Sequence, residues 1–236
     1  MPGSREPPPS LPAYGRKLAP VDAARLTAMV REVPLDFGGG CSAAKALALA
    51  DLMIQFDVRD AIEIGVYRGR SLLPVAEVLR LRGAGRVIGI DPWSVSEALQ
   101  REDHELGAAV NEFARAHPWE DTYRGVLERI ERHGLGAHCE LLRMTSEAAA
   151  GQIPERSVGL VHIDGNHDPA AVAADVALYE PKLRPGGLLV LDDASWGSVR
   201  PILETLRARL TPVLHLHDAV FVFDEEQQTD FAVFRV

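Results

Sequence analysis

The sequence predicts a single α/β domain built on a mainly parallel β-sheet that helices cover on both faces. Three observations support this fold class. Short, almost continuously apolar segments alternate with amphipathic helical segments, a pattern typical of strands that are buried on both sides. A glycine-containing turn joins the first of these strands to its helix. Two longer strand-like segments close the chain and predict a terminal hairpin.

Composition limits the possible functions. The 236 residues suffice for one substantial core, and the formal net charge of −9 argues against nucleic acid as the main partner. No apolar run reaches membrane-spanning length, so we expect no membrane partner. The two cysteines, Cys41 and Cys139, form neither a disulfide framework nor a zinc motif. We therefore expect reduced thiols in a cytoplasmic protein.

The N-terminal part divides into a tail and a helical region. Residues 1–20 are polar and rich in proline, which predicts a flexible tail in front of a domain spanning residues 21–236. Helical spacing over Val21–Val33 predicts a first helix, and three consecutive glycines at 38–40 break the chain. Ser42 is placed to cap a second helix. Residues 21–60 are thus predicted to be N-terminal helices.

The rest of the chain alternates between strands and helices. The predicted strands are Ala61–Gly65, Arg86–Asp91, Cys139–Arg143, Val158–Asp164 and Gly187–Asp192. The predicted helices are Ser71–Leu81, Asp121–Arg132, Pro169–Leu183 and Ser198–Leu210. Asp168 followed by Pro169 is typical of a helix start. Val213–Phe223 and Asp230–Val236 predict the closing strands, joined by a polar turn over residues 224–229.

One connection is unusually long. Residues 92–118 follow the second strand and exceed the length of an ordinary strand-to-helix loop. They leave the edge of the sheet at which open α/β sheets bind ligands. We therefore predict that they form a lid over a binding site, together with the helices that precede Ile62. Trp93, Trp119 and Trp196 are candidate pocket residues, although core packing is an equally good explanation for each.

The turn after the first strand indicates the chemistry. Glu63, Gly65 and Gly69 form the pattern E-x-G-x-x-x-G between an apolar strand and a helix. Glycines there let the backbone approach a ligand closely, and the helix N-terminus suits a carboxylate or phosphate. The pattern is not the dinucleotide motif G-x-G-x-x-G, because Glu63 occupies the first glycine position.

Acidic residues end three of the predicted strands. Asp91 ends the second strand, where a carboxylate can accept hydrogen bonds from ribose hydroxyls. Asp164 ends the fourth strand, and Asp192 and Asp193 end the fifth. In a parallel sheet these groups meet at one edge, where their repulsion favours a bound cation such as Mg²⁺ or Ca²⁺. His167 lies close by in sequence and could accept a proton.

Each acidic feature also has a purely structural interpretation. Asp91 could cap a strand end, and the Asp192–Asp193 pair could lie in a solvated loop. His167 could be a residue at a helix start with no chemical role. The functional interpretation rests on all of these residues falling at the same edge of one sheet.

The E-x-G-x-x-x-G turn formed by Glu63, Gly65 and Gly69 resembles motif I of class I S-adenosylmethionine (SAM) methyltransferases. It is most similar to motif I of the catechol-type O-methyltransferases. The resemblance covers roughly residues 42–236 and implies a Rossmann-like, seven-stranded, mainly parallel sheet with an antiparallel last strand. It implies that SAM is bound by the residues Glu63, Gly65, Tyr67, Gly69, Ser71, Asp91, Ser146 and Asp164. In that family the tyrosine and serine of the motif lie along the methionine part of SAM.

The resemblance also assigns the reaction. Asp164, Asp192 and Asp193 resemble a magnesium-binding set, and His167 occupies the position of the general base. The D-x-x-H pattern followed by an acidic pair is closer still to bacterial natural-product O-methyltransferases of the macrocin and mycinamicin type. The catechol-type enzymes have Asp-Asn and lysine where this chain has Asp-Asp and histidine.

The expected activity is metal-dependent methyl transfer from SAM to a hydroxyl of a small molecule, such as a natural product, sugar or phenol. Two alternatives remain open. One is a metal-independent methyltransferase that acts on an amine or carboxylate, and the other is a SAM-binding protein that transfers no methyl group. The sequence leaves the oligomeric state open, a homo-oligomer included.

Overall fold

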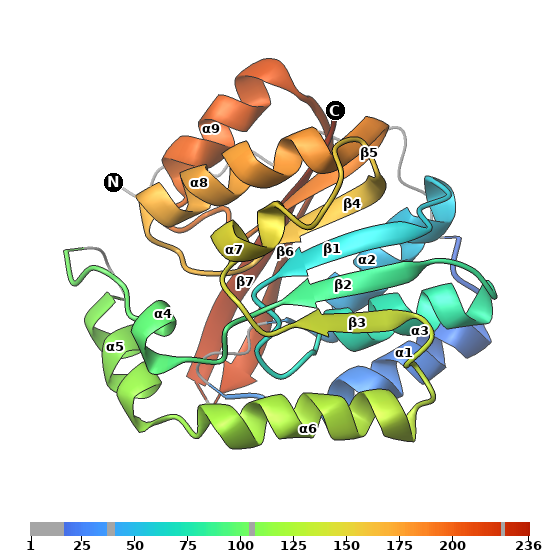
Figure 1. Ribbon diagram of the computed structural model, residues 1–236, viewed down its shortest axis with the longest axis horizontal. Coiled ribbons are helices and arrows are strands. Elements are labelled where there is room, and N and C mark those ends of the chain that lie inside the picture. Colours follow the sequence, from blue (N-terminus) through green and yellow to red (C-terminus); the bar gives the residue numbers. More distant parts are fainter. Residues whose placement is uncertain (1–16, 37–40, 104–106, 223–224) are drawn as a thin grey trace.

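The computed structural model describes residues 17–36, 41–103, 107–222 and 225–236. Its centre is a seven-stranded sheet in the order β3-β2-β1-β4-β5-β7-β6 (Figure 1). The strands are β1 (Asp60–Ile64), β2 (Arg86–Ile90), β3 (Cys139–Leu142), β4 (Val158–Ile163), β5 (Leu183–Asp192), β6 (Thr211–Val222) and β7 (Glu225–Arg235).

Strand direction follows the predicted pattern. The pairs β1–β2, β2–β3, β1–β4 and β4–β5 are parallel, whereas β7 runs antiparallel to both β5 and β6. Every residue of β4 is buried, in keeping with a strand covered on both faces. The predicted fold class, including the antiparallel last strand, is confirmed.

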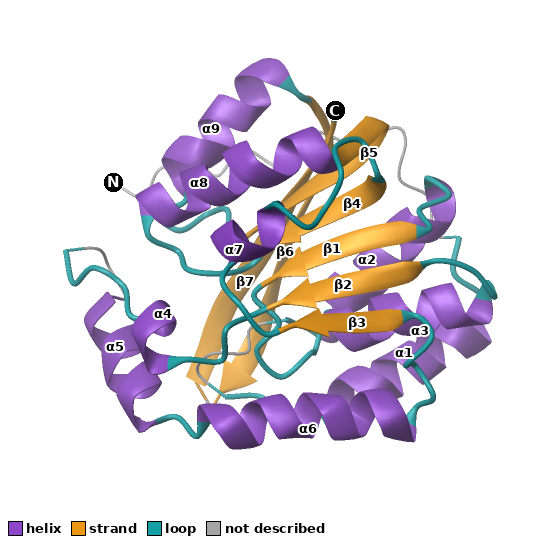
Figure 2. Cartoon of the chain, viewed as in Figure 1, coloured by secondary structure: helices purple, strands orange, loops and turns teal. Residues whose placement is uncertain are grey.

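Helices cover both faces of the sheet (Figure 2). They are α1 (Pro20–Glu32), α2 (Ala43–Gln55), α3 (Leu72–Leu81), α4 (Val95–Ala98), α5 (Gly107–Ala116), α6 (Trp119–Arg132), α7 (Ser146–Ala150), α8 (Pro169–Tyr179), a 3₁₀ turn (Glu180–Lys182) and α9 (Arg200–Arg209). One buried cluster joins the sheet to α1, α2, α3 and α6, and a second joins it to α7, α8 and α9. In the described residues no helix is long and apolar enough to cross a membrane.

Both predicted helix starts are confirmed, but only one of them is capped by a side chain. The Ser42 side chain accepts a hydrogen bond from the backbone N–H of Lys45 at 3.1 Å and caps α2 as predicted. Asp168 also precedes its helix, but its carboxylate accepts the N–H of Arg101 and does not cap α8. The glycines at 38–40 and most of the predicted tail, residues 1–16, lie outside the described residues.

The long segment after β2 contains two helices, α4 and α5, beyond the carboxyl ends of β1, β2 and β3 (Figure 1). Asn111 of α5 accepts the N–H of Gln100 and donates to its carbonyl, both at 2.7 Å. Asn166, after β4, donates to the carbonyl of Leu99 at 3.0 Å. The described part of this segment is therefore tied to the sheet edge, and its role as a lid stays a prediction.

The predicted turn of the terminal hairpin was too long. Residues 225–229 belong to β7 and pair with residues 218–222 of β6. Backbone hydrogen bonds can continue a two-stranded ladder beyond the core, so these polar residues remain in a strand. The apolar pattern alone marks only the buried part of such a strand. Residue 224 of the predicted turn lies outside the described residues.

Candidate functional site

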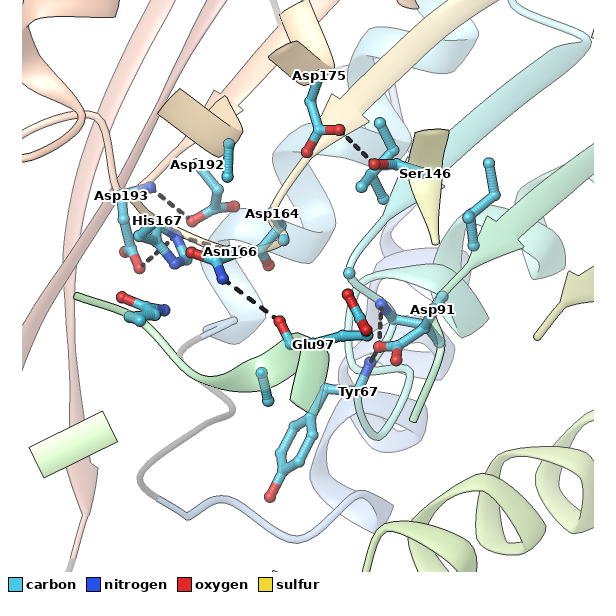
Figure 3. Close-up of a pocket in the computed structure, with 18 of the residues that line it drawn as sticks. Tyr67, Asp91, Glu97, Ser146, Asp164, Asn166, His167, Asp175, Asp192 and Asp193 are labelled. Atoms are coloured by element: carbon cyan, nitrogen blue, oxygen red, sulfur yellow. Dashed lines mark hydrogen bonds and ion pairs between the residues drawn. The ribbon is translucent and has the colours of Figure 1, made fainter. Parts of the chain in front are cut away.

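A cavity of about 990 Å³ opens at the carboxyl ends of the parallel strands. Figure 3 shows how its wall brings together the turn after β1, Asp91 after β2, Ser146 after β3, and the acidic residues that follow β4 and end β5. These segments are far apart in sequence. The parallel topology places them at one edge, as the sequence predicts.

Gly65 fits closely against the end of β4. Its φ is +83°, and a Cβ atom built there would lie 1.9 Å from the carbonyl oxygen of Asp164. Its N–H donates to the carbonyl of Ile90 at 2.9 Å. Gly69 also has a positive φ, +82°. The glycine turn therefore brings three strand ends together, and only a residue without a side chain fits at position 65.

Asp91 organises this turn. One of its oxygens accepts the N–H groups of Val66 and Tyr67 at 3.0 and 2.9 Å, and the other accepts the N–H of Trp93 at 2.7 Å. Burial raises the pKa of Asp91, and the three donors oppose that rise. Asp91 lines the cavity and is 8% exposed. Ribose binding by Asp91 stays a prediction, to which the structure adds a role in holding the turn.

Glu63 and Ser71 are tied to each other. The Ser71 hydroxyl donates to Glu63 at 2.8 Å, and Glu63 is 2% exposed beneath the turn. Nδ1 of His162 lies 3.4 Å from Glu63, and Nε2 of the same ring lies 2.8 Å from Asp192. Burial lowers the pKa of His162, but the two carboxylates outweigh it and raise the pKa to about 10. A protonated histidine thus links the glycine turn to the acidic residues.

Lys45 is a site residue that the sequence pattern does not predict. From α2, its ammonium group donates to Asp192 and to the Thr229 hydroxyl, and the residue is 1% exposed. Burial alone would raise the pKa of Asp192, but the charge of Lys45 and the hydrogen bond from His162 hold it well below its usual range. The available signal was a lysine among the apolar positions of an otherwise buried helix.

Removing the Lys45 charge should destabilise the fold strongly. We expect Lys45→Met to lower the free energy of unfolding by about 3–5 kcal/mol, because the Asp192 carboxylate would stay buried without its ammonium partner. Urea denaturation measures the loss. The control is Arg86→Met, which removes an exposed ion pair with Glu140 and should cost about 1 kcal/mol or less. Equal losses in the two variants would contradict the ion-pair argument.

Asp164, His167 and Asp193 form a compact group on the cavity wall. Nε2 of His167 lies 3.3 Å from Asp193 and 3.8 Å from Asp164. Each residue offers one ligand atom, and these atoms lie within 4.8 Å of one another. Burial raises the pKa of Asp193 to about 8 and, together with the charge of Asp192, raises that of Asp164. A bound cation would relieve this crowding, so the donor set fits a divalent metal ion.

A second set of possible ligands, His215, His217 and Asp230, does not fit a metal ion as well. Arg207 donates to Nδ1 of His215 at 2.9 Å, so Nε2 carries the proton and donates to Asp230 at 2.6 Å. A metal-binding histidine needs one ring nitrogen with a free lone pair for the metal. In His215 the lone pair of Nδ1 already accepts the hydrogen bond from Arg207. Asp230 instead supports the loop after β5, because it accepts the hydroxyl of Ser195 at 2.8 Å.

Ser146 lies at another part of the cavity wall, at the start of α7. Its hydroxyl donates to Asp175 of α8, and its carbonyl accepts the Tyr179 hydroxyl at 2.7 Å. Asp175 lines the cavity and was not singled out in the sequence. Its signal was a carboxylate on the buried face that also carries Val172, Val176 and Tyr179.

The three tryptophans have different roles. Trp93 is 2% exposed, packs on Tyr123, and is a core residue. Trp119 and Trp196 line the cavity, where Trp196 lies 4.7 Å from the His167 ring, centroid to centroid. The Tyr67 hydroxyl donates to Asp36 at 2.7 Å, so this residue contributes mainly its ring to the wall.

Comparisons with known proteins agree with the geometry. A family model described as a methyltransferase domain matches residues 62–194. Tricin synthase 1 from Oryza sativa subsp. japonica is 31% identical over 156 residues, which are 66% of this chain and 53% of that protein. The chain thus spans about half the length of this relative.

Solved structures share the fold at low sequence identity. The O-methyltransferase TomG from Streptomyces achromogenes, involved in tomaymycin synthesis and solved with SAM, is 15% identical with a TM-score of 0.57, covering 92% of this chain and 91% of TomG. An O-methyltransferase from Bacillus cereus in complex with SAH is 15% identical with a TM-score of 0.54, covering 93% of each chain.

Proposed function

The chain belongs to the methyltransferase-domain family, and on that premise we propose that it transfers a methyl group from SAM to a hydroxyl of a small molecule. The observation that carries the proposal is the single cavity wall shared by the glycine turn, Asp91 and the acidic group around Asp164. The sequence relative named tricin synthase supports a natural-product acceptor, and we include phenols and sugars among the candidate acceptors.

The residues of the cavity wall have separate roles in binding SAM and in moving the proton. The turn around Gly65 and Gly69 holds the methionine part of SAM, and Asp91 with Ser146 holds the nucleoside. His167 takes the proton from the acceptor hydroxyl, whose oxygen attacks the sulfonium methyl carbon while the carbon–sulfur bond breaks and leaves S-adenosylhomocysteine (SAH). Most of the rate acceleration comes from alignment of oxygen, carbon and sulfur.

We further propose that Asp164 and Asp193 hold a divalent cation, most simply Mg²⁺. Asp192, the third predicted ligand, lies beside them with its two oxygens engaged by Lys45 and His162. A bound cation would lower the pKa of the acceptor hydroxyl and fix its position. Lys45 and His162 keep Asp192 ionised and fixed in place. The positive charge of Lys45 also offsets part of the negative charge of Asp164, Asp192 and Asp193, so a bound cation has less charge to balance.

The test combines binding with methyl transfer. Calorimetry should detect binding of SAM and SAH, and methyl-labelled SAM should label hydroxylated acceptors from a panel of phenols and sugars. We expect chelation to stop transfer, added Mg²⁺ to restore it, and SAH binding to survive both treatments.

Each alternative predicts a different result. Transfer to an amine or carboxylate that persists after exhaustive chelation would support the metal-independent enzyme. SAM binding without transfer to any acceptor would support a protein that does not methylate. Failure of the unaltered protein to bind SAM or SAH would contradict the proposed function itself.

A further inference from the structure

Asp175 is a buried carboxylate on the cavity wall that the proposed chemistry leaves without a role. It lies on α8, is 5% exposed, and shares its cavity-facing side with Ala171, Ala174 and Leu178. Figure 3 shows Asp175 beside Ser146, apart from the group formed by Asp164, His167 and Asp193. The cavity therefore has a second acidic position, some way from the proposed site of methyl transfer.

The two oxygens of Asp175 have different surroundings. Oδ1 accepts the hydroxyl of Ser146, which is the one side chain that donates to Asp175 within the described part of the chain. Oδ2 lies over the turn after β4, where a Cβ atom built on Gly165 would be 3.6 Å away. Because residue 165 is a glycine, no side chain occupies the space beside Oδ2. Burial raises the pKa of Asp175 to about 6, and the hydrogen bond from Ser146 opposes that rise.

Oδ2 accepts a hydrogen bond from no described side chain and faces the cavity, so a hydrogen-bond donor of a bound ligand can replace water at this oxygen. The ligand part expected here follows from the strand order. Asp91 ends β2, and Ser146 follows the neighbouring strand β3, so a nucleoside whose ribose lies at Asp91 extends its base toward Ser146 and Asp175. Adenine carries an exocyclic amine, a neutral hydrogen-bond donor that matches a carboxylate oxygen.

We propose that Asp175 recognises the 6-amino group of the cofactor's adenine and, with Ser146, selects an adenine nucleoside over bases that lack this amine. The inference rests on the proposed function, because it takes the cofactor to be SAM. Asp175 thus determines cofactor specificity and takes no part in methyl transfer.

The test compares two ligands that differ at one position. SAH and its 6-deamino analogue, in which hydrogen replaces the amino group, are titrated calorimetrically against the unaltered protein and against Asp175→Ala. We expect the unaltered protein to prefer SAH by about 10- to 100-fold, the effect of one hydrogen bond to a charged acceptor. In Asp175→Ala the two ligands should bind within about twofold of each other, because the acceptor for the amine is gone.

Two further variants keep the result interpretable. Asp175→Asn retains an acceptor for Ser146 without the charge, so it should fold and lose most of the preference even if the alanine variant does not fold. Glu147→Ala removes an exposed carboxylate from the same cavity wall and should keep the full preference.

A preference for SAH that survives in both Asp175 variants, or that disappears in Glu147→Ala, would overturn the inference and leave the proposed function intact. Absence of SAH binding to the unaltered protein would instead remove the proposed function, and this inference with it.

Discussion

Replacing Gly65 with alanine is expected to lower SAH affinity by at least about 100-fold and to destabilise the fold by about 2–4 kcal/mol. The added Cβ would lie 1.9 Å from the Asp164 carbonyl oxygen, a distance that forces the turn and the end of β4 apart. The same movement would displace the N–H groups that Asp91 holds. Calorimetry measures the affinity, and urea denaturation measures the stability.

The matched control is Gly83→Ala. Gly83 also has a positive φ, +66°, but a Cβ built there meets nothing within 4 Å. This variant therefore carries the backbone cost of a left-handed residue, about 1 kcal/mol, without the steric clash. SAH affinity should be unchanged. If Gly65→Ala behaves like Gly83→Ala, the close approach to β4 is unimportant for binding.

The position of Gly65 was predictable because local signals and topology agree there. A strand that is covered on both faces appears as a continuous apolar run, without alternation of polar and apolar residues. In this chain the first such run ends at Gly65. Acidic residues at the ends of β2, β4 and β5 must share an edge once those strands are parallel. The grouping of Asp91, Asp164 and Asp193 therefore followed from element order alone.

Lys45 and Asp175 could not be placed in the same way. The contact between Lys45 and Asp192 joins residues 147 positions apart, on a helix and a strand whose relative rotation depends on packing. Asp175 lies on a helix face that is otherwise apolar, where the sequence pattern predicts only core residues. In both cases the charged group is stabilised by tertiary partners, and helical periodicity does not identify those partners.

The polar start of β7 was missed for a different reason. Apolar residues indicate the predicted strands, whereas residues 225–229 are held in β7 by backbone pairing with β6. A tertiary contact also decides the role of Ser71, a residue whose hydroxyl side chain was predicted to lie along the methionine part of SAM. In the structure that hydroxyl donates to Glu63, so Ser71 can donate to SAM only if this hydrogen bond breaks when SAM binds.

Replacing His167 with alanine is expected to lower turnover by about 10²–10⁴-fold, the range for loss of a general base. His167 is placed for this role because its ring lies against Trp196 on the cavity wall, beside Asp164 and Asp193. SAH affinity should change little, since the ring is not part of the predicted cofactor contacts. Methyl transfer from labelled SAM and calorimetry measure the two quantities on the same preparation.

The structure also allows His167 to be a metal ligand, and the two roles separate by a third measurement. Mn²⁺ binding, followed by its electron paramagnetic resonance signal, should be unchanged in His167→Ala if the histidine is the base, and should weaken by about 10-fold or more if it ligates the ion. His133→Ala is the control, because His133 pairs with Glu32 outside the cavity wall and should preserve all three quantities. Lowered stability with unchanged turnover per folded molecule would reduce His167 to a structural residue. Water or one of the neighbouring carboxylates would then have to accept the proton.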